Sequence, residues 1–366
     1  MIFNNIYKNR KVLITGNTGF KGSWLSTWLL KLGANVIGIS KDVPTNPSMF
    51  EILKLKKKIK YYKSDIRELS KISKIIKKEK PDFIFHLAAQ PIVSISHNNP
   101  IETISSNALG TANVLESLKL SNHKCTAVII TSDKVYDNIE QHRGYKEDDS
   151  IGGKDIYSGS KGAAELIIKS YYHSFFKSKT FKISIAIARA GNVIGGGDWA
   201  KDRIVSDCMK NWSNNKIVEL RSPKATRPWQ HVLEPLSGYL NLASKLYKDK
   251  SLHGEAFNFG PKLKQNQTVE ELIKDLSKHW NLEDKNIYKI KNSLSFHEAK
   301  LLKLNSNKAF STLKWKPNLD YKDNIRLTSE WYFDFYKTKK DMFDKTQEQI
   351  LEYENLAKKN KLKWME

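Results

Sequence analysis

The sequence predicts an α/β protein: a doubly wound parallel sheet with a smaller, interleaved mixed α/β region. Three observations support this fold class. Apolar runs alternate with segments of helical periodicity over about the first 190 residues, and a glycine-rich turn joins the first of each. The chain has 366 residues, 40% of them hydrophobic, which is enough for a large core.

Each predicted strand is a short apolar run bounded by turn residues. The first covers residues 11–15 and stops at Gly16, and further strands are predicted at residues 34–40, 59–65, 81–89 and 126–132. Helical spacing of apolar residues predicts helices over residues 21–32, 70–80 and 107–120. Strands that alternate with helices form right-handed βαβ units and therefore a parallel sheet.

The composition changes after residue 190. Residues 191–230 are rich in Gly, Asp, Trp and Arg, which predicts loops around one helix. A helix and a strand at residues 255–260 follow, so the segment of about 231–262 is expected to return to the first unit. We therefore predict one domain of residues 1–190 with that returning segment. The second region comprises residues 191–230 and 263–366, with helices at residues 269–280 and 341–358.

The chain is basic, with a formal net charge of +23. Only 8 of its 62 basic residues are Arg, the residue that best binds nucleic-acid bases and phosphates through two hydrogen bonds. We therefore expect a solvated lysine-rich surface and no nucleic-acid site. No apolar run reaches the ~18–20 residues that span a bilayer, and we see no signal peptide. Cys125 and Cys208 alone make neither a disulfide framework nor a zinc site. We expect a reduced, soluble, cytoplasmic protein without a metal.

Gly16, Gly19 and Gly22 form a G-x-x-G-x-x-G turn between the first strand and its helix. Such a turn lets the backbone approach a pyrophosphate at a helix N-terminus, which predicts a Rossmann-type dinucleotide site. The acid that usually ends the second strand is not evident among residues 40–42, so this feature leaves NAD and NADP open. Asp65 and Ile66 follow the third strand; they are candidates for the adenine edge, or Asp65 is a helix N-cap.

Tyr157 and Lys161 are spaced i and i+4, which places them on one face of a helix. An ammonium beside a phenol favours tyrosinate, so such a tyrosine can act as a base below its ordinary pKa of ~10. Ser132 ends a predicted strand. Together with the glycine turn, these three residues predict a catalytic site.

At this point the chain resembles the extended short-chain dehydrogenase/reductase family of sugar-nucleotide epimerases and dehydratases. The matching segments are TGNTGFKG (15–22), HLAAQP (86–91), SNALGT around Asn107, TSDKVY (131–136) and YSGSK (157–161). The resemblance implies that Tyr157 removes a sugar hydroxyl proton while NAD takes hydride. It also implies that Lys161 lowers the pKa of Tyr157 and holds the nicotinamide ribose, and that Ser132 bonds the reacting oxygen.

The same resemblance implies NAD as the cofactor and a wider set of residues that bind it. These residues are Gly16, Thr18, Gly19, Phe20, Lys21, Gly22, Asp65, Ile66, Leu87, Ala88, Ala89, Asn107, Tyr157 and Lys161.

Dehydratases of this family usually carry Thr-Asp-Glu where this chain has Ser132-Asp133-Lys134. The resemblance implies that Asp133 is the acid for a departing 6-hydroxyl and Lys134 the base for the C5 proton. A lysine can serve as that base only if burial or Lys161 lowers its pKa. With a lysine at this position, the chain resembles the dehydratases that act on CDP-glucose and the inverting UDP-N-acetylglucosamine dehydratases. The inverting enzymes typically lack a tyrosine at the position of Tyr157.

Residues 188–207 and 221–240 resemble the CDP-glucose branch, and GFKGSW, PTNPSMFEIL and HEAKLLKLNSNKA agree with it. The implied substrate is CDP-glucose. The implied contacts are Gln90, Asn192, Arg203, Arg227 and His231, with Lys201 a further candidate. Arg227 is the best pyrophosphate clamp because a guanidinium bridges two oxygens. His231 is otherwise a structural histidine, and Trp199 and Trp229 fit a core. The glycines at 195–197 fit a conformational need before Asp198.

Other functions stay open. A 4-epimerase of the same fold would need no acid and base at 133–134, and a non-catalytic NAD-binding regulator would need neither Tyr157 nor Lys161. The resemblance further implies a homo-oligomer, either a dimer or a tetramer. It also implies a deoxysugar product that feeds surface polysaccharide such as O-antigen lipopolysaccharide or capsule.

Overall fold

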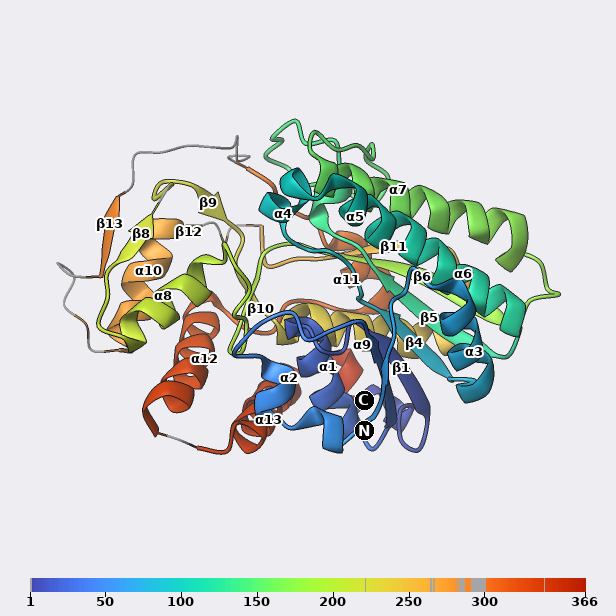
Figure 1. Cartoon of the computed structure of the whole chain (residues 1–366), viewed down its shortest axis with the longest axis horizontal. Helices are drawn as coiled ribbons and strands as arrows, with labels where there is room; N and C mark the ends of the chain where they lie inside the picture. Colours follow the sequence, from blue (N-terminus) through green and yellow to red (C-terminus); the bar gives the residue numbers. More distant parts are fainter. Residues whose placement is uncertain are drawn as a thin grey trace.

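The computed structural model of the chain describes residues 2–220, 222–263, 265, 267–280, 282, 287–290, 301–338 and 340–366. A parallel seven-stranded sheet forms its centre, in the order β11-β6-β5-β4-β1-β2-β3 (Figure 1). Its strands are β1 (Lys11–Thr15), β2 (Asn35–Ser40), β3 (Lys60–Lys63), β4 (Phe83–His86), β5 (Cys125–Ile130), β6 (Ile183–Ala190) and β11 (Ala256–Phe259). The predicted doubly wound parallel sheet is confirmed.

Alternate residues of the central strands supply two separate cores, one on each face of the sheet. On β1, Val12 and Ile14 belong to one core and Leu13 to the other, and all three side chains are fully buried. One face is covered by α1 (Phe20–Lys31), α9 (Leu233–Lys248) and α13 (Met342–Lys359), and the other by α3 (Leu69–Glu79), α6 (Gly110–Ser121) and α7 (Ile156–Tyr171). Burial on both faces explains the uninterrupted apolar runs.

The predicted helices are found with small shifts of their ends. Predicted helix 107–120 corresponds to α6, preceded by a π-helical turn at Ser105–Leu109. Predicted helices 269–280 and 341–358 correspond to α10 (Val269–Lys278) and α13. The sequence analysis did not identify several elements, among them β6, α2 (Met49–Ile52), α4 (Val93–Asn98), α5 (Pro100–Ile104), α11 (Asn307–Leu313) and α12 (Tyr321–Phe333), nor the short strands within and after residues 191–230.

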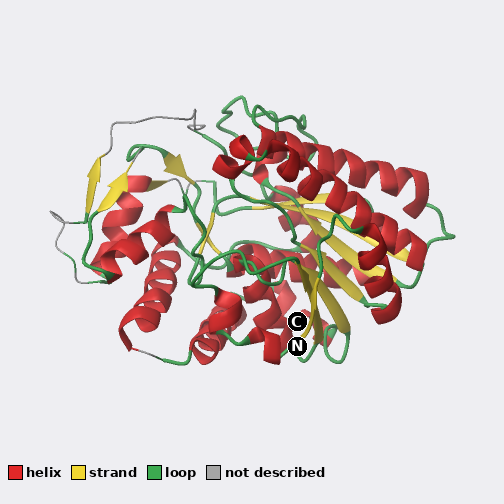
Figure 2. Ribbon diagram, in the orientation of Figure 1, coloured by secondary structure: helices red, strands yellow, loops and turns green. Residues whose placement is uncertain are grey.

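Beyond the sheet, a smaller group of elements lies to one side (Figure 2). Its helices are α8 (Ile204–Ser213), α10 and α12. Its short strands form three separate pairs: β7 (Val193–Ile194) with β10 (Gln230–His231), β8 (Val218–Leu220) with β13 (Tyr288–Ile290), and β9 (Thr226–Arg227) with β12 (Gln267–Thr268). Between them in sequence, α9 and β11 return to the central sheet.

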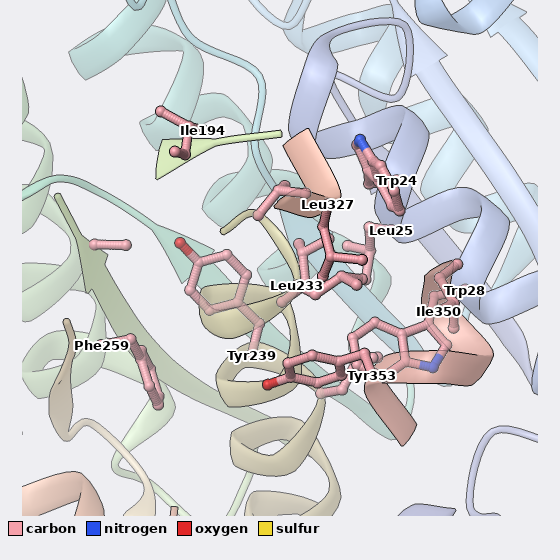
Figure 3. Packing of buried hydrophobic residues seen from close by; sticks show 14 of the residues in the cluster. Trp24, Leu25, Trp28, Ile194, Leu233, Tyr239, Phe259, Leu327, Ile350 and Tyr353 are labelled. Atoms are coloured by element: carbon pink, nitrogen blue, oxygen red, sulfur yellow. The ribbon is translucent and has the colours of Figure 1, made fainter. Parts of the chain in front are cut away.

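The predicted domain boundaries remain a prediction. They place α13 in the smaller region, whereas the structure packs α13 against α1 of the sheet half. Trp28 of α1 donates a hydrogen bond from Nε1 to Glu354 of α13 (2.8 Å), and Lys31 pairs with the same carboxylate (2.5 Å). Figure 3 shows Trp28, Tyr353 and Ile350 in this shared core. The segment HEAK at 297–300, used above for the resemblance, lies outside the described residues.

Two further predictions concern the cysteines and the membrane. Cys125 and Cys208 are both buried and not in a disulfide. No helix in the described part of the chain is long and apolar enough to cross a membrane.

A buried ion pair ties α7 to β6. The Arg189 guanidinium pairs with both carboxylate oxygens of Glu165, and both side chains are fully buried. Arg189 Nη1 also donates to the Tyr136 hydroxyl (2.6 Å), and Thr131 Oγ1 donates to Glu165 (2.6 Å). Since Glu165 lies one turn beyond Lys161, this network holds the face of α7 that carries Lys161 against the sheet.

We expect Arg189→Met to lower the free energy of unfolding by roughly 3–5 kcal/mol, because it leaves the Glu165 carboxylate buried without its partner. Urea-induced unfolding measures the change. Glu68→Gln, which removes the exposed partner of Lys71, is the control and should change stability by less than about 1 kcal/mol. Equal changes in the free energy of unfolding in the two variants would show that the buried pair stabilises the fold no more than an exposed pair does.

Candidate active site

Several of the predicted site residues lie in segments that follow the carboxyl ends of the central strands. The strand order reverses between β1 and β4, which are neighbours although β2 and β3 intervene in sequence. Ligands of doubly wound sheets bind in the crevice outside such a reversal. The glycine turn follows β1, residues 87–90 follow β4, Ser132 to Lys134 follow β5, and Asn192 follows β6.

The glycine turn has a geometry that only glycine permits. Gly16 has φ +77°, and a Cβ there would lie 2.7 Å from the Ala88 nitrogen. A Cβ on Gly22 would lie 2.1 Å from the Gly16 carbonyl oxygen, because α1 packs directly on the turn. Gly19 caps α1 in extended conformation and has no side chain to satisfy the first helical N–H groups. This cradle at a helix N-terminus fits the pyrophosphate of a dinucleotide.

The end of β2 supports this turn. Ser40 Oγ donates to Asn17 Oδ1 (2.9 Å), and the Thr18 N–H donates to Ser40 Oγ (3.3 Å). Lys41 pairs with Glu102 (2.8 Å) instead of entering the turn. The buried Asn17 Nδ2 has no hydrogen-bond partner among the described residues. An unpaired donor at this position fits a phosphate-bearing ligand.

Asp65 is not a helix N-cap. The N-cap residue of α3 is Glu68, whereas the Asp65 carboxylate accepts from the Arg67 N–H (2.9 Å) and pairs with the Arg67 guanidinium (2.6 Å). The N-cap alternative is therefore wrong. Contact of Asp65 and Ile66 with adenine remains a prediction, and Ile66 is buried against Gly110.

Asn107 and Gln90 hold the loop after β4. Asn107 Oδ1 accepts from the Gln90 N–H (2.8 Å), and its Nδ2 donates to Ser160 Oγ of α7 (2.8 Å). The Gln90 side chain donates to Thr103 (2.9 Å) and accepts from the Ile92 N–H (2.6 Å). The side chains of Asn107 and Gln90 thus form hydrogen bonds with other groups of the protein. The contact of Asn107 with NAD and that of Gln90 with substrate remain predictions.

Ser132, Asp133 and Tyr157 meet above β5. Ser132 Oγ donates to Asp133 Oδ1 (2.9 Å) and accepts from the Lys134 N–H (3.2 Å). Burial raises the pKa of Tyr157, opposed mainly by a hydrogen bond with Ser132 and by the charge of Arg203. The net shift is upward because desolvation of the phenolate dominates. The lowering of this pKa by Lys161 remains a prediction.

Two of the lysines at the site, Lys21 from α1 and Lys161 from α7, lie close enough for their charges to repel. Burial, and then the charge of Arg203, lowers the pKa of Lys21 to about 8. Burial, and then the charge of Lys21, lowers the pKa of Lys161 to about 8. Several cations in one partly desolvated space make a site that attracts polyanions.

Asp133 is a buried carboxyl with a raised pKa. It is 5% exposed, and burial raises its pKa despite the charges of Lys134, Lys21 and Arg227. A Cβ on Gly191 would lie 2.9 Å from Asp133 Oδ2, so the carboxyl lies against the backbone that follows β6. Lys134 is half-buried next to it. A buried acid of this kind suits proton donation near neutral pH.

Two arginines reach this space from outside the sheet. Arg227, on β9, and Arg203, at the start of α8, act on Asp133 and Tyr157 respectively through their charges. Arg203 also donates to the Pro91 carbonyl (3.4 Å). Asn192 is half-buried, and its carbonyl accepts from the Gln230 N–H (3.2 Å). Lys201 is exposed.

His231 lies in the core. Its ring is fully buried, 5.7 Å from that of Trp24, and Nδ1 accepts from the Leu233 N–H (3.4 Å). Its Nε2 has no hydrogen-bond partner among the described residues. Burial, and then the charge of Arg326, lowers the pKa of His231 to about 3. Its predicted substrate contact stays a prediction, and the ring is neutral.

Two tryptophans and the run of three glycines have structural roles. Trp199 and Trp229 are buried in the main core, as the core interpretation predicts. A Cβ on Gly196 would lie 2.1 Å from Trp331, and Gly197 has φ +85°, so packing and turn geometry explain these glycines.

Sequence reasoning missed two side chains at the site. The half-buried Asp198 carboxyl interacts through its charge with Lys21 and Arg203, and the GGGDW segment was a signal for it. Burial, and then the charges of Asp133 and Tyr157, raises the pKa of Tyr239, which lies on α9. No local motif marks Tyr239, because it sits on the buried face of an ordinary helix.

Comparison with known proteins was made on this basis. A model of the GDP-mannose 4,6 dehydratase family matches residues 13–328. The CDP-glucose 4,6-dehydratase of Salmonella typhimurium is 43% identical over 335 residues, 91% of this chain and 93% of that protein. The structure of epimerase Mth375 from Methanothermobacter thermautotrophicus matches with TM-score 0.78 and 23% identity, covering 92% of this chain and 96% of that one. DesIV, a dTDP-glucose 4,6-dehydratase from Streptomyces venezuelae with NAD and TYD bound, matches with TM-score 0.76 and 20% identity, covering 90% and 100%.

The parallel sheet, the glycine cradle and the grouping of Ser132, Tyr157 and Lys161 define an extended short-chain dehydrogenase/reductase. The chain belongs to the GDP-mannose 4,6 dehydratase family, as the family match over residues 13–328 and the 43% identical relative show. The structural neighbours support the fold.

We expect the His231 imidazole to remain neutral between about pH 5 and pH 8, because its burial disfavours the cation. Nitrogen NMR of the imidazole signals, with His231→Gln to assign the resonance, measures this. A titration midpoint inside that range would show that water reaches the ring and that His231 is not in the core.

Proposed function

We propose that this protein is an NAD-dependent hydro-lyase that converts CDP-glucose to CDP-4-keto-6-deoxyglucose and water. The 43% identical relative named CDP-glucose 4,6-dehydratase supports this substrate. The observation that carries the reaction class is the buried Asp133, next to Ser132 and held toward its protonated form. An acid in this position is needed to expel water from C6, whereas an epimerase has no step that uses it.

Support for NAD comes from the cradle of the glycine turn. Gly16 and Gly22 leave no room for a Cβ, and Asn17 Nδ2 has no hydrogen-bond partner in the described part of the chain. Lys161 and Tyr157, one helical turn apart, would hold the nicotinamide ribose beside the sugar. When bound, NAD accepts hydride from C4 of the sugar and returns it to C6.

Tyr157 takes the proton of the 4-hydroxyl as C4 becomes a ketone, and Ser132 positions that oxygen. Since burial raises the pKa of Tyr157, the opposing hydrogen bond with Ser132 and the charge of Arg203 are what bring the phenolate within reach. Arg203 and Arg227 would bind the two phosphates of the substrate as well, because each guanidinium bridges two oxygens.

Elimination follows at C5 and C6. The C4 ketone makes the C5 proton acidic, and the Lys134 amine removes it. The protonated Asp133 carboxyl gives its proton to the 6-hydroxyl, the C6–O bond breaks, and water leaves. This step leaves a carboxylate on Asp133 and an ammonium on Lys134, and the Lys134 ammonium returns a proton to C5 when hydride is added at C6.

We predict that the purified protein forms a 4-keto sugar from CDP-glucose, detected by its absorbance in alkali, and does so faster than from UDP-glucose or dTDP-glucose. Asp133→Asn and Lys134→Ala should each slow this by about 10²–10⁴-fold, because each removes a proton-transfer group. Asp137→Asn, at an exposed aspartate four residues further on, is the matched control and should keep full activity.

Unchanged turnover in both Asp133→Asn and Lys134→Ala would contradict the dehydratase and favour an epimerase or another route. No keto sugar from any of the three substrates, in a protein that still binds NAD, would favour a non-catalytic regulator.

We further propose that the protein works in the cytoplasm as a homo-oligomer. Apolar side chains are exposed on the α5–α6–α7 face of the sheet half: Ile101 (76% exposed), Ile104 (42%), Leu109 (52%) and Leu166 (57%). Because α5 and the π-helical turn at Ser105–Leu109 both pack against α7, these side chains lie on neighbouring elements, and this face fits a second copy of the chain.

The double variant Leu109→Glu/Leu166→Glu should therefore be monomeric at 42.1 kDa, whereas the parent should have at least twice that mass by light scattering. Leu351→Glu, at a 48% exposed leucine on α13, is the control and should keep the parent mass. A double variant of unchanged mass would place the interface elsewhere.

A further inference from the structure

Tyr136 ends the short helical turn that carries the two groups proposed for the elimination. Asp133 and Lys134 lie in this turn, which spans Asp133–Val135. The two backbone hydrogen bonds that close the turn are long, at 3.4 and 3.5 Å. Hydrogen bonds of this length are weak. The position of the turn therefore depends on contacts that its flanking residues make elsewhere.

The Tyr136 ring is held between two side chains. The residue is 2% exposed, and its ring stacks on the Tyr145 ring at a distance of 4.9 Å between centres. On the Arg189 side, the central guanidinium carbon lies 4.8 Å from the centre of the Tyr136 ring. A phenylalanine would make the same two contacts. Packing of the ring therefore does not explain why this residue carries a hydroxyl.

The Tyr136 hydroxyl joins two groups of buried hydrogen bonds. It accepts from Arg189 Nη1 (2.6 Å) and donates to Asn258 Oδ1 (2.8 Å). Arg189 in turn pairs with Glu165 of α7. Asn258 Nδ2 donates to the carbonyl oxygens of Tyr145 (2.8 Å) and Asn305 (3.3 Å). The side chains of Arg189, Glu165 and Asn258 are fully buried, so a bond lost here is costly.

This path connects the two sets of groups that the proposed reaction uses. Glu165 lies one turn beyond Lys161 and two turns beyond Tyr157 on α7, so the ion pair with Arg189 fixes the helix that carries them. Tyr136 lies two residues after Lys134. The hydroxyl thus links the elimination groups to the oxidation groups through two hydrogen-bonded side chains.

Backbone bonds give the turn a second link. The Gly152 N–H donates to the Val135 carbonyl (2.8 Å), and the Asp137 N–H donates to the Ser150 carbonyl (3.0 Å). These bonds fix the path of the chain after the turn. A variant that changes only the side chain at residue 136 keeps them, so we expect it to fold with the same loop.

We propose that Tyr136 is a positioning residue whose hydroxyl, bonded to Arg189 and Asn258, holds the preceding turn in a fixed place relative to α7. This rests on the proposed function, in which α7 serves the oxidation at C4 and the turn serves the elimination across C5 and C6. Loss of the hydroxyl displaces the turn and leaves α7 in place, since the ion pair of α7 with Arg189 remains. Elimination therefore slows, while oxidation continues.

Tyr136→Phe tests this assignment in the full-length enzyme with NAD bound, mixed with less than one equivalent of CDP-glucose. Quenched samples give the ratio of 4-keto-glucose to 4-keto-6-deoxyglucose by mass spectrometry, and absorbance gives the NADH. Elimination should slow by about 10–100-fold, because small displacements of reacting groups have effects of this size. Oxidation should change by less than about 3-fold, so 4-keto-glucose and NADH should accumulate. The ratio does not depend on how much of the protein is folded.

Tyr145→Phe is the matched control. The Tyr145 hydroxyl donates to Asn138 Oδ1 (2.9 Å) and accepts from the Ile139 N–H (2.7 Å). The variant therefore removes a hydroxyl from the other ring of the same stacked pair and leaves the bonds of Tyr136 intact. It should keep the ratio of the parent.

Asn258→Ala is the second test variant, because it removes the acceptor of the Tyr136 hydroxyl and keeps the phenol. It should shift the ratio in the same direction as Tyr136→Phe. A ratio like that of the parent in Tyr136→Phe, or in Asn258→Ala where Tyr136→Phe does not fold, would overturn the proposal. Equal slowing of oxidation and elimination would also overturn it, since the hydroxyl would then act on the whole site.

Asp133→Asn separates this outcome from failure of the proposed function. It removes the acid of the elimination, so it should accumulate NADH and 4-keto-glucose as well. If it accumulates neither, the proposed function of Asp133 fails. If it accumulates both and Tyr136→Phe behaves like the parent, only the role of Tyr136 is lost.

Discussion

Burial of ionisable groups at one edge of a parallel sheet is the constraint on which this site depends. Because all seven strands run the same way, the segments that follow β1, β4, β5 and β6 converge. Desolvation there raises the pKa values of Asp133 and Tyr157 and lowers those of Lys21 and Lys161 to about 8. All four groups are thereby moved toward their neutral forms, which is the condition for exchanging protons near neutral pH.

The interleaved path of the chain brings two arginines from the smaller group of elements to the edge of the sheet. Arg203 and Arg227 come from the smaller group of elements and act on Tyr157 and Asp133. The chain then returns through α9, which passes beneath the site and carries Tyr239. A substrate bound between the halves would therefore meet anion-binding groups on one side and proton-transfer groups on the other.

Much of this arrangement could be predicted from local sequence. The apolar runs identify strands because both faces of the sheet are buried, and Gly16 marks its turn because a Cβ would strike Ala88. The i, i+4 spacing places Tyr157 and Lys161 on one face of α7. The pKa of Tyr157 could not be predicted, since it depends on how much water the whole fold excludes. Nor could the internal bonding of Gln90, which depends on partners from α5.

The proposed reaction oxidises C4, eliminates across C5 and C6, and reduces C6 of one hexose at a single site. Conversion of CDP-glucose labelled with deuterium at C4 tests it directly, with the product analysed by NMR. We expect the deuterium at C6 of a 4-keto-6-deoxy sugar and hydrogen from the solvent at C5. Deuterium returned to C4 of a sugar that keeps its 6-hydroxyl would rule out this sequence of steps.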